Sequence, residues 1–325
     1  MGIELSVIIP AYNAAGQIDS CLTALDQQSY PRESFEVIVV DDGSSDGTPS
    51  RVANYPVSYF HQENQGPAAA RNKGASVARG SIILFTDSDC VPTKTWVEEM
   101  AAPFSDPQVA AVKGVYRTDQ KQLTARFAQV EFEERFEMLA ALPQIDMIDT
   151  YSAGFRREIF LALGGFDTGF PEANNEDTEF SYRMAAKGYT MVFAPKAVVS
   201  HLGHPDTVLR YARLKFGRGY WRMMVYKRFP QKMMKDSYTP QTLKFQILVA
   251  LLGVGVLPLL VVSPGLGRIL LLILILSFVI FSFSFVLFAL RRDFLVGLFS
   301  PFFLLIRAVA LGFGAVWGAV SARLT

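Results

Sequence analysis

The chain carries the run Ser81-Ile82-Ile83-Leu84-Phe85-Thr86-Asp87-Ser88-Asp89, an apolar segment that ends in two acids. Such a short apolar run bounded by polar residues predicts a buried strand. Residues two apart on a strand point the same way, so Asp87 and Asp89 share one face at its exit. Two carboxylates this close repel each other unless a cation lies between them, and Mg²⁺ or Mn²⁺ prefers such oxygen ligands. The run predicts a metal site at a strand end, with ordinary loop acids as the alternative.

The surrounding sequence predicts an α/β fold with a doubly wound, mostly parallel sheet. Residues 5–10 and 35–40 are short β-branched runs, and residues 14–28 between them have helical spacing. A second helical segment, residues 67–78, leads into the strand at Ser81. Repeated β-α-β units of this kind form a parallel sheet with both faces covered, and ligands gather at the carboxyl ends of its strands.

Polar residues follow each of the predicted strands. Tyr12 comes after the first and is suited to stacking on a nucleobase, while Asp42 comes after the second and is suited to accepting a hydrogen bond from a ring N–H. Both positions are equally compatible with simple Asx and glycine turns. Arg71 lies on the helix that opens at Pro67, where a helix N-terminus and a cation can meet a diphosphate. No G-x-G-x-x-G follows the first strand, which argues against a dinucleotide-dependent dehydrogenase.

The composition changes near Tyr238, and three long apolar segments follow: residues 243–262, 269–290 and 294–320. Each reaches the roughly 20 residues that cross a bilayer as a helix, which predicts two to three transmembrane helices over residues 241–325. The third is interrupted by Pro301 and has Arg307 near its middle. It is either re-entrant or interfacial, or a spanning helix whose arginine faces protein or snorkels.

The formal net charge is +1, which argues against a nucleic-acid partner, but cations are concentrated between Arg210 and Lys235. Aromatic residues alternate with these cations, so residues 206–240 are predicted to form a basic amphipathic interfacial segment at an anionic leaflet; a solvated basic face is the alternative. By the positive-inside tendency this segment is cytoplasmic, as are Arg291 and Arg292. The chain is therefore predicted to be a multi-pass protein of the inner or plasma membrane, with its first domain in the cytoplasm.

Taken together, residues 6–13, 41–48, 66–74 and 87–89 resemble the family 2 glycosyltransferases of GT-A fold. The resemblance covers about the first two hundred residues and implies a GT-A catalytic domain over residues 1–205. It implies an inverting enzyme that depends on Mn²⁺ or Mg²⁺ and uses a nucleotide-diphosphate sugar. It further implies that Tyr12 and Asp42 contact the base, that Arg71 lies near the phosphates, and that Asp87 and Asp89 serve ribose and metal. The matching motifs also assign Pro10 and Glu176 to substrate binding.

The resemblance directs attention to two further residues. Asp177, in the Glu176-Asp177 pair, matches the family's general base, which removes a proton from the attacking alcohol. The alternative is structural, because Asn174 or Asn175 can cap a helix whose first turn favours acids. His201 matches a position that often supplies a further metal ligand, although a lone histidine is more often a structural or surface residue.

The acceptor is inferred from two departures from related enzymes. The Gln-x-x-Arg-Trp sequence of processive members is missing, so a single transfer is expected. Relatives that glycosylate polyprenyl phosphate have less need of a base, so Glu176-Asp177 favours a hydroxyl acceptor on a lipid-linked sugar or glycolipid at the cytoplasmic leaflet. The alternatives are a polyprenyl-phosphate glycosyltransferase, a nucleotidyltransferase, and a non-catalytic nucleotide-sugar-binding membrane scaffold.

Overall fold

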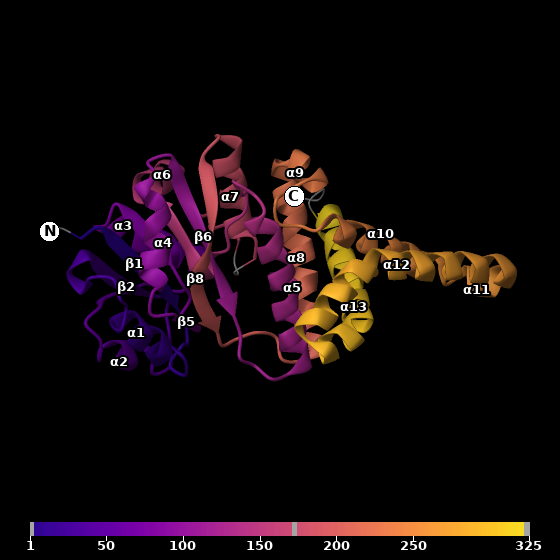
Figure 1. Cartoon of the computed structure of the whole chain (residues 1–325), viewed down its shortest axis with the longest axis horizontal. Helices are drawn as coiled ribbons and strands as arrows, with labels where there is room; N and C mark the ends of the chain where they lie inside the picture. Colours follow the sequence, from indigo (N-terminus) through magenta and orange to yellow (C-terminus); the bar gives the residue numbers. More distant parts are fainter. Residues whose placement is uncertain (1–2, 171–173, 322–325) are drawn as a thin grey trace. The chain divides into compact units, whose positions relative to one another are not determined.

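The computed structural model describes residues 3–170 and 174–321, and these divide into two compact units. The first comprises Met1–Asp119 and Met138–Gly203, and the second comprises Gln120–Glu137 and His204–Thr325. The first unit holds the sheet and the second is helical (Figure 1). The segment Gln120–Glu137, which lies inside the predicted catalytic domain 1–205, groups with the C-terminal helices. The predicted boundaries at residues 205 and 240 stay predictions.

The first unit is built on one eight-stranded sheet of order β3-β2-β1-β4-β7-β6-β8-β5. The strands β3, β2, β1 and β4 run parallel, whereas β7 is antiparallel to both β4 and β6, β6 is parallel to β8, and β5 is antiparallel to β8. This confirms the predicted α/β class and its mostly parallel sheet. The bounds, in chain order, are β1 Leu5–Ala11, β2 Phe35–Asp41, β3 Ser58–His61, β4 Ile82–Phe85, β5 Cys90–Pro92, β6 Val109–Arg117, β7 Ala153–Arg156 and β8 Thr190–His201.

Helices connect these strands and cover the sheet (Figure 1). The helix α3 packs closely on β1 because Gly74 has no side chain; a Cβ there would overlap Ile8. The core of this unit contains a cluster of phenylalanines whose contacting ring centroids lie 4.9–6.3 Å apart: Phe85, Phe155, Phe160, Phe166 and Phe180. The helices of this unit are α1 Ile18–Asp26, α2 Thr48–Val52, α3 Pro67–Val77, α4 Trp96–Ala101, α6 Arg157–Ala162 and α7 Glu176–Ala186, with 3₁₀ turns η1 Arg32–Ser34, η2 Ala102–Ser105 and η3 Thr150–Ser152.

The second unit consists of helices. They are most of α5 Leu123–Ala140, then α8 Val208–Arg228, α9 Pro230–Met234, α10 Gln241–Val256, α11 Leu259–Val262, α12 Pro264–Arg292 and α13 Phe294–Ser321. The helices α10 and α11 pack against α12 and form a helical hairpin with it (Figure 1). The apolar core of this unit joins α5, α8, α12 and α13 through Phe127, Tyr211, Phe285, Phe303 and Leu304.

The predicted apolar segments need one correction. Residues 243–262 do not form a single long helix, because α10 ends at Val256 and the chain restarts as α11 after Pro258. Proline lacks the N–H that would continue the helix. The third segment forms the continuous 28-residue helix α13, with Pro301 inside it. The helices long and apolar enough to cross a membrane, among the residues described, are α12 and α13.

Arg307 is accommodated in α13 by a buried ion cluster. Its side chain is 2% exposed; Nη1 donates to Glu131 at 2.9 Å and Nη2 donates to Gln246 at 2.6 Å. Lys215 of α8 lies 2.9 Å from the other oxygen of Glu131. Glu131 has its pKa held well below the ordinary value, because Lys215 and Arg307 outweigh the opposing effect of burial. The arginine therefore faces protein, one of the two arrangements that the sequence allowed.

The basic helix α8 packs along α13. A Cβ at Gly219 of α8 would meet the backbone of Leu311, and one at Gly314 or Gly318 of α13 would meet the backbone of Phe216 or Tyr220. Small residues of this kind let two helix backbones approach closely. One side of α8 is therefore covered by α13, and the predicted lipid-facing surface is reduced to the remaining side.

Candidate active site

The carboxyl ends of β1, β2 and β4 meet at one edge of the sheet, because these strands are parallel neighbours. Tyr12 follows β1 and is 55% exposed, so its ring is available for stacking. Asp42 comes directly after β2, and one residue lies between the end of β4 and Asp87. Pro10 is buried within β1, where it pairs in register with Val40. The sheet thus brings the three predicted strand-end positions to the same edge.

Asp42 has a structural role that the sequence did not indicate. The residue is buried, and its carboxylate accepts hydrogen bonds from the Gln62 side chain at 2.7 Å and from the backbone N–H groups of Gln65 and Gly66 at 2.9 and 2.8 Å. These bonds fix the loop that enters α3. The predicted contact of Asp42 with a base therefore needs a carboxylate lone pair that these three donors do not occupy.

Arg71 is buried and binds two of the acids of the candidate site. Its side chain is 2% exposed; Nη2 donates to Asp87 at 2.7 Å and Nη1 donates to Glu176 at 2.9 Å. Both terminal nitrogens therefore bind protein carboxylates, and the guanidinium fixes the orientation of Asp87. The predicted phosphate contact of Arg71 stays a prediction.

Glu176 and Asp177 open α7, after Asn175 in a left-handed conformation with φ of 69°. Burial and the neighbouring Asp177 raise the pKa of Glu176 to about 7, although Arg71 opposes the shift. Asp177 is half-buried, and its Oδ1 accepts a hydrogen bond of 2.6 Å from the N–H of Thr178. No side chain caps α7 at Asn175, so the capping alternative is not realised there.

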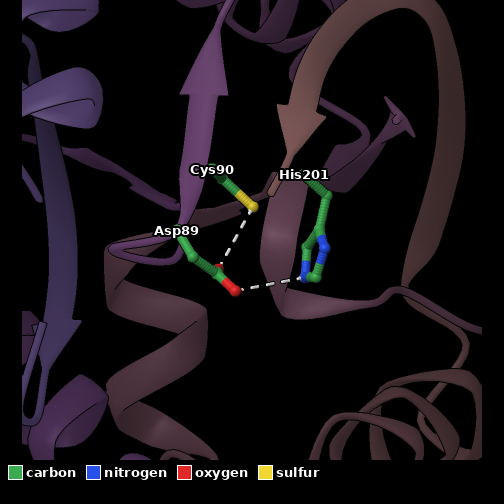
Figure 2. Close-up of side chains that lie close together, drawn as sticks. All are labelled: Asp89, Cys90 and His201. Atoms are coloured by element: carbon green, nitrogen blue, oxygen red, sulfur yellow. Dashed lines mark hydrogen bonds and ion pairs between the residues drawn. The ribbon is translucent and has the colours of Figure 1, made fainter. Parts of the chain in front are cut away.

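Asp89, Cys90 and His201 form a cluster of potential metal ligands at the meeting point of β5 and β8 (Figure 2). Their ligand atoms lie within 4.8 Å of one another; His201 Nε2 is 3.6 Å from Asp89 Oδ2, and Cys90 Sγ is 3.9 Å from Asp89 Oδ1. Burial, helped by the charge of Asp87, raises the pKa of Asp89, while His201 opposes the shift. A carboxyl group whose ionised form is disfavoured in this way gains stability from a bound cation.

The donor set fits a divalent cation held chiefly by oxygen and imidazole nitrogen. Carboxylate and imidazole ligands suit Mn²⁺, whereas a thiol is a softer ligand. His201 Nδ1 accepts a hydrogen bond from the Gly203 N–H at 3.1 Å, so the neutral ring carries its proton on Nε2, toward Asp89. Ligation through Nε2 therefore requires the proton to move to Nδ1 and the Gly203 contact to open.

Sequence reasoning missed two features near this edge. The spacing of the two cysteines, Cys21 and Cys90, indicates no metal site, because spacing along the chain does not show that β5 pairs with β8 and brings Cys90 beside His201. Lys113 in β6 is fully buried and binds the Asp149 carboxylate and the Tyr151 hydroxyl. The available signal was a single lysine inside an apolar strand. The ring of Tyr116 contacts both Tyr151 and the potential metal ligand His201. Its centroid lies 4.2 Å from that of Tyr151 and 5.4 Å from that of His201.

The sequence is similar to known glycosyltransferases. Residues 6–164 match the family model described as Glycosyl transferase family 2, so the chain contains a domain of this kind. It is 28% identical to glycosyltransferase AglE of Haloferax volcanii, over 66% of this chain and 72% of that protein. It is 30% identical to validoxylamine A glucosyltransferase of Streptomyces hygroscopicus subsp. jinggangensis, over 58% of this chain and 52% of that protein. The chain thus spans only about half of this second relative.

Solved structures confirm the GT-A-type fold. The mannosyltransferase PcManGT from Pyrobaculum calidifontis, in complex with GDP-Man and Mn²⁺, superposes with a TM-score of 0.61 at 21% identity, over 98% of this chain and 88% of that one. Glucosyl-3-phosphoglycerate synthase from Mycobacterium tuberculosis gives a TM-score of 0.52 at 20% identity, over 70% and 80% of the two chains. At these identities the likeness concerns the fold alone.

Proposed function

We propose that the family 2 domain makes this chain an inverting glycosyltransferase, which moves a sugar from a nucleotide-diphosphate sugar to a hydroxyl of a lipid-linked sugar or glycolipid. The observation that carries the proposal is the grouping of Asp87, Asp89, His201 and Asp177 in one unit that has the GT-A-type fold. The neighbour solved with GDP-Man and Mn²⁺ supports a nucleotide-sugar donor and a divalent ion.

The proposed roles follow from the chemistry of each group. Asp89 and His201 hold Mn²⁺ or Mg²⁺, with Asp87 oriented beside them by Arg71. The bound ion would neutralise the charge that develops on the departing diphosphate. Tyr12 stacks on the base, and Asp177 accepts the proton of the attacking hydroxyl. A single displacement of this kind inverts the anomeric carbon.

We further propose that the chain acts at the cytoplasmic face of the inner or plasma membrane. The support is the apolar character of α12, whose outward residues include Ile269, Leu272 and Ile280, each at least 58% exposed. Water does not stabilise such a surface, whereas the hydrocarbon of a bilayer does. The cations of α8, together with Arg291 and Arg292, support a cytoplasmic position of these helix ends by the positive-inside tendency.

The proposal is tested with the full chain purified in detergent. A panel of nucleotide-diphosphate sugars is incubated with Mn²⁺ and with lipid-linked or soluble acceptors, and the products are identified by mass spectrometry. We expect one donor to give a glycosylated lipid and a nucleoside diphosphate. Equal transfer to a soluble sugar contradicts the lipid acceptor, and release of inorganic diphosphate identifies a nucleotidyltransferase instead.

The role of Asp177 separates hydroxyl from phosphate acceptors. Asp177→Asn should lower transfer to a hydroxyl by roughly 10²–10⁴-fold, because the amide cannot take the proton. Asp106→Asn, at an exposed turn, is the matched control and should leave transfer unchanged. If Asp177→Asn keeps most of its activity on polyprenyl phosphate, that lipid is the acceptor. A chain that binds nucleotide and Mn²⁺ but neither transfers nor hydrolyses is a scaffold.

A further inference from the structure

The second unit contains a pocket of about 290 Å³ between the helices that surround the start of α10. The residues of α8, α10 and α13 that line it come from the same compact unit, as does Arg135 of α5. Its volume is close to the lower limit of about 300 Å³ for small-molecule sites. None of the residues that line it belongs to the candidate active site described above.

The walls of this pocket are strongly cationic. Of the described residues that line it, none is an aspartate or glutamate, whereas five are basic: Arg135, Lys215, Arg218, Arg222 and Lys244. Glu131 lies behind the wall and pairs with Lys215 at 2.9 Å and with Arg135 at 3.8 Å, which offsets part of the charge. Burial and the nearby Arg218 lower the pKa of Lys215 to about 7, although Glu131 opposes the shift. An anion in the pocket would relieve this accumulation of positive charge.

Most of the remaining pocket wall is apolar, apart from Thr239 and the hydroxyls of Tyr226 and Tyr238. Leu243 and Ile247 of α10 line it, together with Leu311 of α13 and Met223 of α8. A pocket with cations and apolar walls suits an amphiphile that has an anionic head, rather than a fully hydrated anion.

The position of the pocket along α10 indicates where such an amphiphile comes from. The α10 residues that line it, Leu243, Lys244 and Ile247, belong to the first two turns of that helix. The next turns expose Leu248 and Leu252 by 53% and 50%. The polar pocket is thus followed along α10 by an apolar surface, as expected at the level where lipid headgroups meet hydrocarbon.

We propose that this pocket binds the phosphate headgroup of an anionic membrane lipid, with its hydrocarbon following the exposed apolar surface of α10. Arg218, Arg222 and Lys244 donate hydrogen bonds to the phosphate oxygens. The two arginines can each form a bidentate contact.

The first test uses the unmodified full chain. Methionine methyl groups are labelled with ¹³C and observed by NMR in detergent, during titration with short-chain phosphatidic acid. We expect the resonances of Met223 and Met233, which line the pocket, to shift and saturate, while that of Met100, buried in the sheet unit, stays unchanged. Inorganic phosphate at the same concentration should give little or no shift. Equal shifts from phosphate identify a free-anion site and overturn the lipid proposal.

The second test removes two of the lining cations. Arg222→Gln with Lys244→Gln should weaken phosphatidic acid binding at least about tenfold, since each charged hydrogen bond contributes that order of affinity. Arg213→Gln with Lys227→Gln removes the same charge from exposed positions of α8 outside the pocket and is the matched control. Arg222→Lys with Lys244→Arg should retain binding. An equal loss in the control pair shows unspecific attraction and contradicts the proposal.

These measurements are independent of catalysis. Lipid binding without sugar transfer would leave the pocket proposal intact and refute the glycosyltransferase. Sugar transfer with unshifted Met223 and Met233 would do the reverse.

Discussion

Arg71 orders the acids of the candidate site. It is buried between Asp87 and Glu176 and binds both. Removing one partner of such a group leaves an uncompensated buried charge, which costs about 3–5 kcal/mol of stability. Arg71 therefore acts as a positioning residue, and its loss is expected to affect the orientation of Asp87 as well as the stability of the fold.

Glu176 makes stability depend on pH. Because its pKa is about 7 in the folded chain and 4.5 ordinarily, the folded chain holds a proton between these values that the unfolded chain has released. The free energy of unfolding therefore falls as the pH rises through this window, by up to roughly 3 kcal/mol. Thermal melting between pH 5 and 8 should show this fall in the wild type. Glu176→Gln should be less sensitive to pH, and an identical profile would contradict the assignment.

The contributions of His201 and Cys90 to metal binding beside Asp89 can be distinguished by comparing a hard and a soft metal ion. His201→Gln should weaken Mn²⁺ binding at least about tenfold. Cys90→Ala should leave Mn²⁺ binding within about twofold, because a hard ion gains little from a thiol, but should weaken Cd²⁺ binding strongly. Titration followed by electron paramagnetic resonance, with Cd²⁺ as competitor, measures both. Weaker Mn²⁺ binding in Cys90→Ala would show that the thiol is a true ligand.

At this scale the sequence identified residue types and strand ends better than side-chain partners. The apolar run before Asp87 does form a strand, β4, which ends at Phe85, whereas the roles of Asp87 and Asp89 stay predictions. The binding of Arg71 to Glu176 could not be predicted, because 105 residues separate them. The same holds for Cys90 and His201, which meet only through the pairing of β5 with β8.

Among the elements, the contact between α8 and α13 depends on glycine. Gly314→Ala should lower the melting temperature, because its methyl group would collide with the Phe216 carbonyl; overpacking of this kind costs about 1–3 kcal/mol. Gly253→Ala in α10 is the control, since nothing lies within 4 Å of the added methyl. The control should be neutral or slightly stabilising. Equal melting temperatures for the two variants would argue against close packing of the helices.

The buried ion pair of Arg307 with Glu131 should contribute more to the free energy of unfolding than the partly exposed pair of Arg126 with Asp293. Arg307→Met leaves Glu131 with fewer cations and should cost about 3–5 kcal/mol. Arg126→Met removes the pair with Asp293, which is partly exposed, and should cost at most about 1 kcal/mol. Denaturation in detergent provides the comparison. Similar losses would mean that burial does not set the value of these pairs.

Hydropathy predicted where the apolar helices lie but not how they are divided. Residues 243–262 have the required length, yet Pro258 separates α10 from α11. Pro301 lies inside α13 without ending it. Composition alone does not distinguish the two prolines, because the packing of α13 against α8 and α12 is a tertiary effect.

For the whole molecule, α5 decides which part of the chain folds independently. Its buried residues Phe127, Val130 and Glu131 contact Tyr211, Phe303 and Arg307, which all follow residue 205. A fragment of residues 1–205 should therefore expose this surface and aggregate, whereas the full chain in detergent should elute as a discrete species. Size-exclusion chromatography with a thermal melt tests this. A soluble fragment with a cooperative transition would show that residues 1–205 fold without the helices that follow them.

This discontinuity also has a consequence for biosynthesis. The chain is made from its N-terminus, so α5 leaves the ribosome while Tyr211, 84 positions after Phe127 in the sequence, is still untranslated. Until then Glu131 lacks Lys215 and Arg307, and the aromatic face around Phe127 lacks Tyr211 and Phe303. The nascent protein must carry this unfinished segment until its last helix has been synthesised, which makes the interval between translation of α5 and of α13 the period when it most needs a chaperone or the membrane insertion machinery.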